Sequence, residues 1–365
     1  MDGIARPKVM KILHVLATPR AEGTPNLVLD WLATGLHEQH VYVLHSQPAD
    51  LTERLSASGA SYEEAEYFAL GWRKFFAILF GIRRICQKRR PDVVICWTTG
   101  FANWVCLGAK LAGVGKLLVH SGNPPNRGFK EEWMARYVMW PISWVGAQCI
   151  CCSDYVRDQF RAIPAMPARL FRSVYNCSRA EDVARRAALV EPRQGNIGEK
   201  MAVMVATLEL HKDHKTLFLS LPTILVKEPG FRIRLIGDGT LRQELEELAN
   251  HLDISHAIEF LGTRRDVPEL LGGADLFVFS TTEQEGLGSV LLEALAAGLP
   301  VVATDVPACR EILAGGKYGT LVKPADPNAL SDAILTGLRK PVRNSEAVRY
   351  AKEFTPENMI AQYLH

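Results

Sequence analysis

The sequence predicts an α/β protein with two parallel-sheet domains. Short apolar runs rich in β-branched residues alternate with helical patterns, this alternation stops once near the middle of the chain, and it then starts again. Alternating strands and helices are typical of βαβ units, whose parallel strands are covered by helices on both faces. A chain of 365 residues also exceeds the size of one ordinary hydrophobic core.

The first half contains five expected strands. Residues 9–17 form the first, and a helical pattern follows from Thr24 and Pro25, which suit an N-cap and a first helical turn. Four further apolar runs come after it: HVYVLHS, DVVICWTT, GKLLVHSG and AQCICCS. They make up an N-terminal domain over residues 1–180.

Residues 181–198 are polar and charged and end in Gly, Asn and Gly, so we expect a linker there. Six more strands follow: MAVMVATL, RIRLIGDG, AIEFLG, ADLFVFS, PVVATD and GTLV. They place a second domain over residues 199–342. An amphipathic helix is expected over residues 343–365.

Composition favours a soluble protein, with 48% hydrophobic and 22% charged residues. Residues 1–180 hold 22 Lys and Arg against 14 Asp and Glu. This excess favours a basic surface facing phosphate, anionic lipid or an acidic substrate, with chance segregation of solvated charges as the alternative. The eight cysteines lack the spacing of a disulfide framework or a zinc site. With no signal peptide evident and no apolar run long enough to span a bilayer, we expect a cytoplasmic protein, soluble or peripheral at the plasma membrane.

The stretch TTEQEGLGSVLLEALAAGLPVVATD (residues 281–305) is the strongest candidate site. Gly286 and Gly288 suit a tight turn after a strand, and the N-terminus of the following helix favours a phosphate. Glu285 can accept from ligand hydroxyls, and Glu293 can accept from two vicinal hydroxyls, as on a ribose. A structural carboxylate bonded to backbone or arginine is the alternative for Glu293. The pattern predicts a nucleotide-sugar site.

Two weaker motifs end other strands of the second domain. Lys212 could reach a diphosphate as a point charge, although a lone loop lysine is commonly solvated. Gly237 and Gly239 form a short G-x-G turn, which occurs as readily without a ligand.

Glu285 and Glu293 form an E-x7-E pair that resembles the donor-binding signature of the retaining glycosyltransferases of family 4. Blocks over nearly the whole chain resemble that family: LIGDGTLRQELEELA, IEFLGTRRDVPELLGGADLFVFST, REILAGGKYGTLVKPADPNALSDAI, SDYVRDQF with SVYNCS, and RYAKEFTPENMIAQYL. The resemblance implies the GT-B fold, in which two Rossmann-like domains face each other across a cleft. It also implies that the C-terminal helix crosses back to the N-terminal, acceptor-binding domain.

The resemblance further implies roles for matched residues. Glu293 would bind the donor ribose, Glu285 the sugar hydroxyls and Lys212 the diphosphate, while His120 would face the reacting sugar. Taken without the resemblance, a histidine at a strand end such as His120 is more often a structural residue with its hydrogen bonds satisfied. We assign His120, Glu285 and Lys212 as catalytic. The expected donor-binding set adds residues from both domains: Gly23, Thr207, Gly237, Gly239, Gly262, Thr263, Arg264, Gly286, Leu287, Gly288, Ser289 and Glu293.

The resemblance implies retention of configuration, no metal ion and no cofactor beyond the nucleoside-diphosphate sugar. The departing diphosphate would help to take the proton of the acceptor hydroxyl. The chain departs from the family at Thr207, where many relatives carry arginine, and this removes a cation beside the leaving group.

The sequence says less about the acceptor, the molecule that receives the sugar, than about the donor. Residues 68–91 mix aromatic and basic side chains, which predicts either a membrane-surface helix or a packed helix with solvated basic flanks. We expect transfer of a hexose-type sugar to a glycan, lipid-linked or amphiphilic acceptor in polysaccharide or glycolipid biosynthesis, without nucleic acid as a partner. The alternatives are a small-molecule acceptor, a nucleotide-sugar epimerase, and a non-catalytic nucleotide-sugar-binding protein.

Overall fold

A computed structural model describes residues 9–20, 23–190, 198–339 and 344–365. It divides into two compact units. The first unit comprises Met1–Tyr175 together with Met359–His365, and the second comprises Asn176–Asn358. Each unit is built on one sheet whose paired strands all run parallel, which confirms the predicted fold class.

The sheet of the first unit has seven strands in the order β3-β2-β1-β4-β5-β6-β7. The strands are β1 (Lys11–Leu16), β2 (Glu38–Val43), β3 (Ser61–Glu64), β4 (Val93–Cys96), β5 (Lys116–Ser121), β6 (Gln148–Cys151) and β7 (Phe171–Ser173). Every residue of β1 and β2 after the first is buried, as expected for a sheet covered on both faces. The two edge strands, β3 and β7, are short and were not predicted, because neither is a continuous apolar run.

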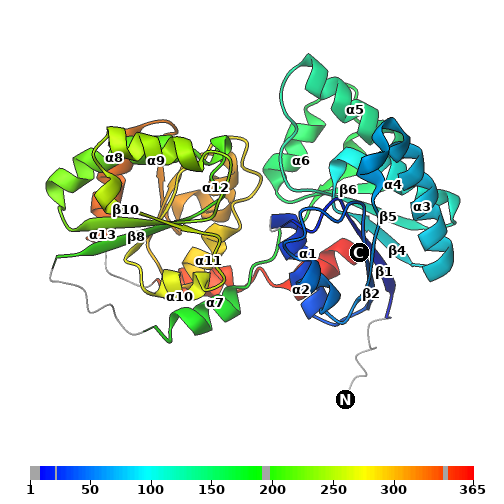
Figure 1. Cartoon of the computed structure of the whole chain (residues 1–365), viewed down its shortest axis with the longest axis horizontal. Helices are drawn as coiled ribbons and strands as arrows, with labels where there is room; N and C mark the ends of the chain where they lie inside the picture. The colour runs from blue at the N-terminus through cyan, green and yellow to red at the C-terminus, as the bar shows by residue number, and fades with distance from the viewer. Residues whose placement is uncertain (1–8, 21–22, 191–197, 340–343) are drawn as a thin grey trace. The chain divides into compact units, whose positions relative to one another are not determined.

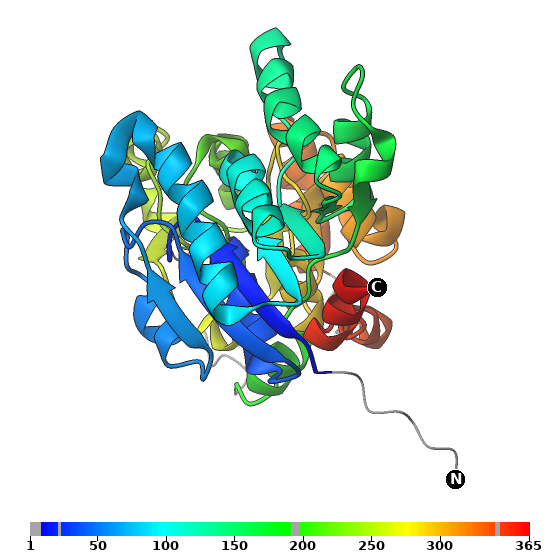
Figure 2. The same ribbon diagram turned by 90° about the vertical axis from the view of Figure 1, so that its right-hand side faces the viewer.

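Helices cover both faces of this sheet (Figure 1). They are α1 (Gly23–Ala33), α2 (Thr52–Ser56), α3 (Lys74–Arg89), α4 (Ala102–Leu111), α5 (Phe129–Trp144), α6 (Asp154–Arg161) and α15 (Pro356–Leu364). In sequence order α3, α4 and α5 pack on one another, while α15 packs on the other side against α1. The last helix, red in Figure 2, therefore returns to the first sheet.

The sheet of the second unit has six strands in the order β10-β9-β8-β11-β12-β13, matching the six predicted runs. The strands are β8 (Lys200–Val205), β9 (Phe231–Ile236), β10 (Ile258–Gly262), β11 (Leu276–Phe279), β12 (Val301–Thr304) and β13 (Thr320–Val322). Its order reverses between β8 and β11, which come from opposite halves of the unit. Such a switch point, at the carboxyl ends of the strands, is where ligands bind in open parallel sheets.

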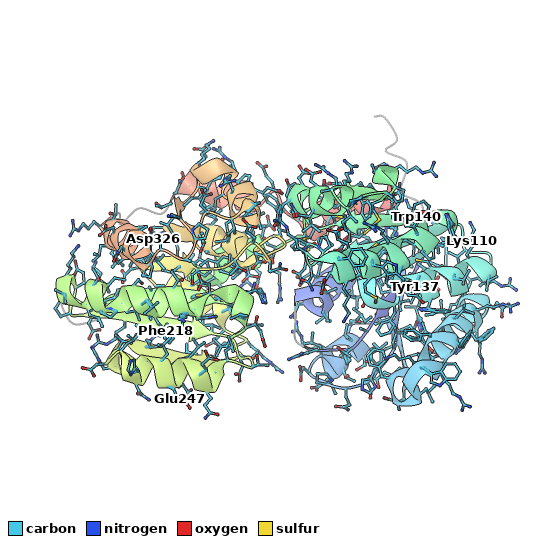
Figure 3. All side chains as sticks on the ribbon, turned by 90° about the horizontal axis from the view of Figure 1, so that it is seen from above. Lys110, Tyr137, Trp140, Phe218, Glu247 and Asp326 are labelled. Carbon is cyan, nitrogen blue, oxygen red and sulfur yellow. The ribbon has the colours of Figure 1, made fainter. Side chains whose placement is uncertain are left out.

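Eight helices and three short 3-10 turns, η4 (Leu210–Lys212), η5 (Ser255–Ala257) and η6 (Ala314–Gly316), complete the described part of the second unit. The helices are α7 (Ala180–Ala187), α8 (His214–Lys227), α9 (Arg242–His251), α10 (Val267–Gly272), α11 (Val290–Ala296), α12 (Pro307–Ile312), α13 (Pro327–Leu338) and α14 (Ser345–Ala351). Figure 1 shows α8 and α9 on one face of the sheet and α7, α10 and α11 on the other. Phe218 of α8, labelled in Figure 3, is fully buried.

Two expected segments differ from the structure. The expected linker at 181–198 begins with helix α7, whose Arg186 binds Glu269 of α10, so this helix is part of the second unit; residues 191–197 lie outside the described residues. The expected helix at 343–365 is two helices, α14 and α15; residue 343 is outside the description. Pro356 starts the second of these helices, where its missing N–H costs nothing.

The segment at 68–91 also differs from a single helix. A 3-10 stretch runs from Tyr67 to Arg73 and bends at Gly71, where φ is +56°, before α3 begins at Lys74. Among the residues that the structure describes, no helix is both long and apolar enough to cross a membrane.

Candidate functional site

The candidate site lies where β8 and β11 end in the second unit. Lys212, in η4 after β8, donates to Oε2 of Glu285, which follows β11. Both side chains are largely buried, at 15% and 9% exposure, so the ion pair is shielded from solvent. The Lys212 ammonium also lies over the Phe279 ring, 5.3 Å from its centroid. The structure thus brings together two of the three residues assigned as catalytic.

Hydroxyl side chains hold the two loops against each other. Thr281 donates from Oγ1 to the His211 carbonyl at 2.9 Å, and Ser280 donates to the Asp213 carbonyl at 3.0 Å. The Thr281 amide donates to Oγ1 of Thr304 at 2.9 Å. These residues were missed by the sequence analysis; the available signal was a run of hydroxyl residues directly after a buried strand.

Glu285 occupies part of the backbone that was expected to meet the ligand. Its Oε1 accepts from the amides of Gly286 and Gly288, at 3.2 and 3.1 Å. Gly288 has φ +72°, a conformation that glycine adopts without strain. Two of the amides predicted to meet the donor are therefore engaged by the carboxylate, and Leu287 between them is buried.

The charge of the pair is stabilised from several directions. Burial raises the pKa of the Glu285 carboxyl, but the Lys212 ammonium and the Gly288 amide outweigh burial, so the pKa lies below its usual range. Burial, reinforced by Lys212, lowers the pKa of neighbouring His211. At neutral pH the site holds a carboxylate, an ammonium and a neutral imidazole.

Ser289 directly precedes helix α11, and Glu293 lies within this helix. Helix α11 starts at Val290, so Glu293 is in its first turn. Glu293 is partly exposed, whereas Leu292 and Ala294 beside it are buried. This position of α11 therefore faces outward between buried neighbours.

The two glycines of the G-x-G turn are explained by packing. A Cβ on Gly237 would lie 2.0 Å from the Ala206 carbonyl oxygen, and one on Gly239 would lie 2.5 Å from the Leu208 carbonyl oxygen. The turn therefore passes directly against the backbone around Thr207, which is itself half-buried. Close approach of two backbones is sufficient reason for both glycines, with or without a ligand.

The residues after β10 lie at the surface. Gly262 accepts from the Gly237 amide at 2.9 Å, which joins the ends of β9 and β10. Thr263 and Arg264 are exposed. The Arg264 guanidinium binds both carboxylate oxygens of Asp266, at 2.8 and 2.6 Å, so it is already paired.

Two predicted residues belong to the first unit. Gly23 is the first residue of α1 and is exposed. His120 is near the end of β5 and is buried, with Nδ1 2.7 Å from the Tyr363 hydroxyl. Burial lowers the pKa of His120 to about 4, so the imidazole is neutral at neutral pH.

A family model described as glycosyl transferases group 1 matches residues 190–354. These residues are therefore similar to a glycosyl transferases group 1 domain. They coincide with most of the second unit and contain Lys212, Glu285 and Glu293.

Two curated relatives and one solved structure are also similar to this chain. EpsD of Bacillus subtilis, named as a glycosyltransferase, is 32% identical over 250 residues, which cover 64% of this chain and 65% of EpsD. The lipopolysaccharide core biosynthesis glycosyltransferase LpsE of Rhizobium meliloti is 34% identical over 117 residues, covering 32% of this chain and 34% of LpsE. Both alignments span less than two thirds of the relative.

The crystal structure of Anabaena Alr3699/HepE in complex with UDP and glucose superimposes with a TM-score of 0.82. The superposition covers 97% of this chain and 99% of HepE at 19% identity. The two Rossmann-like units therefore have the GT-B fold, as predicted.

Proposed function

We propose that this protein is a retaining glycosyltransferase of family 4 that uses a nucleoside-diphosphate sugar. The buried Lys212–Glu285 pair, at the switch point of a unit similar to glycosyl transferases group 1, carries the proposal. A cation can neutralise a departing diphosphate, and a carboxylate can bind sugar hydroxyls. That HepE has been crystallised with UDP and glucose supports a nucleotide sugar as donor.

In the proposed reaction the bond between the anomeric carbon and the diphosphate oxygen breaks. An acceptor hydroxyl attacks the same face of the sugar, and its proton passes to the departing phosphate. Lys212 stabilises the charge on that phosphate, so no metal ion is required. Thr207 can offer one hydrogen bond where many family members carry arginine, which leaves Lys212 as the principal cation.

A panel of nucleotide sugars, assayed for hydrolysis and transfer, tests the reaction. We expect the native protein to turn over at least one donor, with retained anomeric configuration and equal rates with and without EDTA. Glu285→Gln should lower kcat/KM about 100-fold, while Glu283→Gln, an exposed neighbour on the same loop, should not. Equal loss in both variants would remove Glu285 from the site; inversion at C2 would indicate an epimerase, and binding without turnover a non-catalytic protein.

For the acceptor, we propose a glycan, lipid-linked or amphiphilic molecule in polysaccharide or glycolipid biosynthesis. LpsE supports this class through its named part in lipopolysaccharide core biosynthesis. Transfer to lipid-linked glycans is expected to exceed transfer to small-molecule alcohols. The reverse preference would favour a small-molecule acceptor instead.

We further propose that the layer formed by α3, α4 and α5 contacts an anionic membrane surface. These helices carry eight basic and two acidic residues. Four exposed aromatic residues share one face of α5: Trp133, Tyr137, Trp140 and Trp144. Figure 3 shows two of them, Tyr137 and Trp140. Aromatic rings beside basic side chains suit the interface of a bilayer.

Some basic residues of α3 are already paired within the protein, so fewer remain to contact a membrane. Lys88 and Arg89 both bind Glu63, whereas Arg83 and Arg84 are exposed. Arg83→Ser/Arg84→Ser should reduce co-sedimentation with vesicles containing phosphatidylglycerol, and Trp144→Ser should do the same. Leu189→Ser, at an exposed apolar residue of the second unit, is the control. Unchanged pelleting of both test variants would refute the membrane contact.

A further inference from the structure

The first unit contains a buried hydrogen bond between a strand end and the C-terminal helix. Nδ1 of His120, on β5, lies 2.7 Å from the hydroxyl of Tyr363, on α15. Tyr363 is fully buried and His120 nearly so. The two residues are 243 positions apart in the chain, so only the return of α15 to the first unit brings them together.

Aromatic packing fixes the orientation of the His120 ring. Trp97 lies against both partners, with its ring centroid 5.1 Å from that of His120 and 5.8 Å from that of Tyr363. The single indole N–H of Trp97 donates to Nδ1 of His14 at 3.0 Å. Trp97 therefore has no donor left for His120, and the Tyr363 hydroxyl is the group that hydrogen-bonds to Nδ1.

Two cations hold α15 in place. Arg172 donates to the carbonyl oxygens of Gln362 and Tyr363, at 2.8 and 3.1 Å. Lys116, the first residue of β5, donates to the carbonyl of Leu364. The last carbonyls of a helix lack partners within it and attract positive charge. The position of the Tyr363 hydroxyl is thus set by contacts at the end of its own helix.

The other ring nitrogen of His120 is available to a ligand. Within the described residues Nε2 is buried and has no hydrogen-bond partner. It faces Gly122, where a Cβ would lie 3.3 Å from Nε2 and 3.8 Å from the Thr24 hydroxyl oxygen. A buried polar atom without a partner is costly, so a ligand atom at this strand end would satisfy it.

We propose that Tyr363 is a positioning residue that donates its hydroxyl proton to Nδ1 of His120 and thereby keeps the ring proton on Nε2. A neutral imidazole nitrogen is a better acceptor than a phenol oxygen, which favours this direction of the hydrogen bond. The bond made by one ring nitrogen determines the protonation of the other. His120 then offers a hydrogen-bond donor, not a base, to a substrate oxygen. This role rests on the proposed function, because it requires a hydroxylated substrate at the end of β5.

Nitrogen NMR of the histidine-labelled full-length protein tests the tautomer without any assay of activity. The His120 signals are those absent from His120→Gln. At neutral pH we expect Nε2 to carry the proton in the native protein and the protonation to become mixed in Tyr363→Phe. A proton on Nδ1 in the native protein, or an unchanged pattern in Tyr363→Phe, would overturn the proposal.

Kinetics test the consequence for the reaction. Tyr363→Phe should lower kcat about tenfold, the factor for one lost hydrogen bond of ~1.4 kcal/mol in the transition state, with the KM for the donor unchanged. Tyr42→Phe is the matched control, because it removes another hydroxyl contact of the same unit, to Tyr67 at 2.6 Å. Equal kcat in the two variants would refute the positioning role. If the native protein turned over no donor, the proposed function would fail and the NMR result would still decide this inference.

Discussion

The ammonium of Lys212 and the carboxylate of Glu285 form an ion pair that is shielded from solvent and joins two loops 73 positions apart in the chain. A buried charge that loses its partner remains desolvated, so breaking such a pair costs more than removing both charges. The pair therefore couples the stability of the second unit to the residues proposed for catalysis.

Lys212→Met should destabilise the protein by about 3–5 kcal/mol at neutral pH, because it leaves the Glu285 carboxylate buried without a cation. Adding Glu285→Gln to that variant should recover much of the loss. Urea unfolding of the single and double variants measures this coupling. Lys215→Met, at an exposed lysine of α8, should change little. Additive losses in the double variant would show that the pair is not coupled.

Acid should destabilise the first unit through its buried histidines. Burial lowers the pKa of His14 to about 3 and that of His120 to about 4, against 6.5 when exposed. The unfolded chain therefore binds protons that the folded chain does not, and stability present above pH ~6.5 is lost as the pH falls towards 4.

Each such histidine contributes about 1.4 kcal/mol per pH unit within that range. Urea unfolding at pH 7.5 and 5.5 should show a smaller difference for His120→Gln than for the native protein. His251→Gln, at an exposed histidine, should preserve the native difference. An identical pH dependence of the unfolding free energy in all three proteins would show that His120 does not contribute to the loss of stability in acid.

Gly237→Ala should destabilise the second unit by about 1–3 kcal/mol, as expected for an overpacked contact. Its Cβ would meet the Ala206 carbonyl oxygen at 2.0 Å, and the glycine has φ +135°. Thermal unfolding measures the loss. Gly115→Ala, where a Cβ would meet nothing within 4 Å, serves as the control. Equal melting temperatures would mean that the turn can move away from β8.

Glu293→Ala should weaken binding of the nucleotide sugar about tenfold, since it removes the proposed acceptor for the ribose hydroxyls. Titration calorimetry with the donor found in the panel measures the change. Glu247→Ala is a control on α9, whose exposed position is labelled in Figure 3. Unchanged affinity in Glu293→Ala would exclude this residue from the ribose site.

The sequence predicted the parallel sheets because buried parallel strands are nearly continuous apolar runs, as β8 and β11 show. It did not predict β3, which is polar and half-exposed at a sheet edge. Helix α7 was also not predicted, because its charged residues resemble those of a linker. The ion pair that attaches it to the second unit joins Arg186 to Glu269, 83 positions away in the chain.

The same limit applies to the candidate site. The E-x7-E spacing indicated Glu285, yet only tertiary structure shows that Gly286 and Gly288 already donate to its carboxylate. The Tyr363–His120 hydrogen bond left no local signal either, because its two residues meet through the return of α15. Contacts between distant segments depend on how helices pack, which residue spacing does not encode.

The return of α15 also determines when the first unit can be completed during synthesis. A ribosome releases residues 1–175 well before Met359–His365. Until those residues emerge, Trp31 and His120 lack the buried ring of Tyr363 that packs against each of them. The nascent first unit therefore remains incomplete, without the Tyr363 ring, while the whole second unit is translated and can fold. This reverses the usual order, in which N-terminal domains finish folding first.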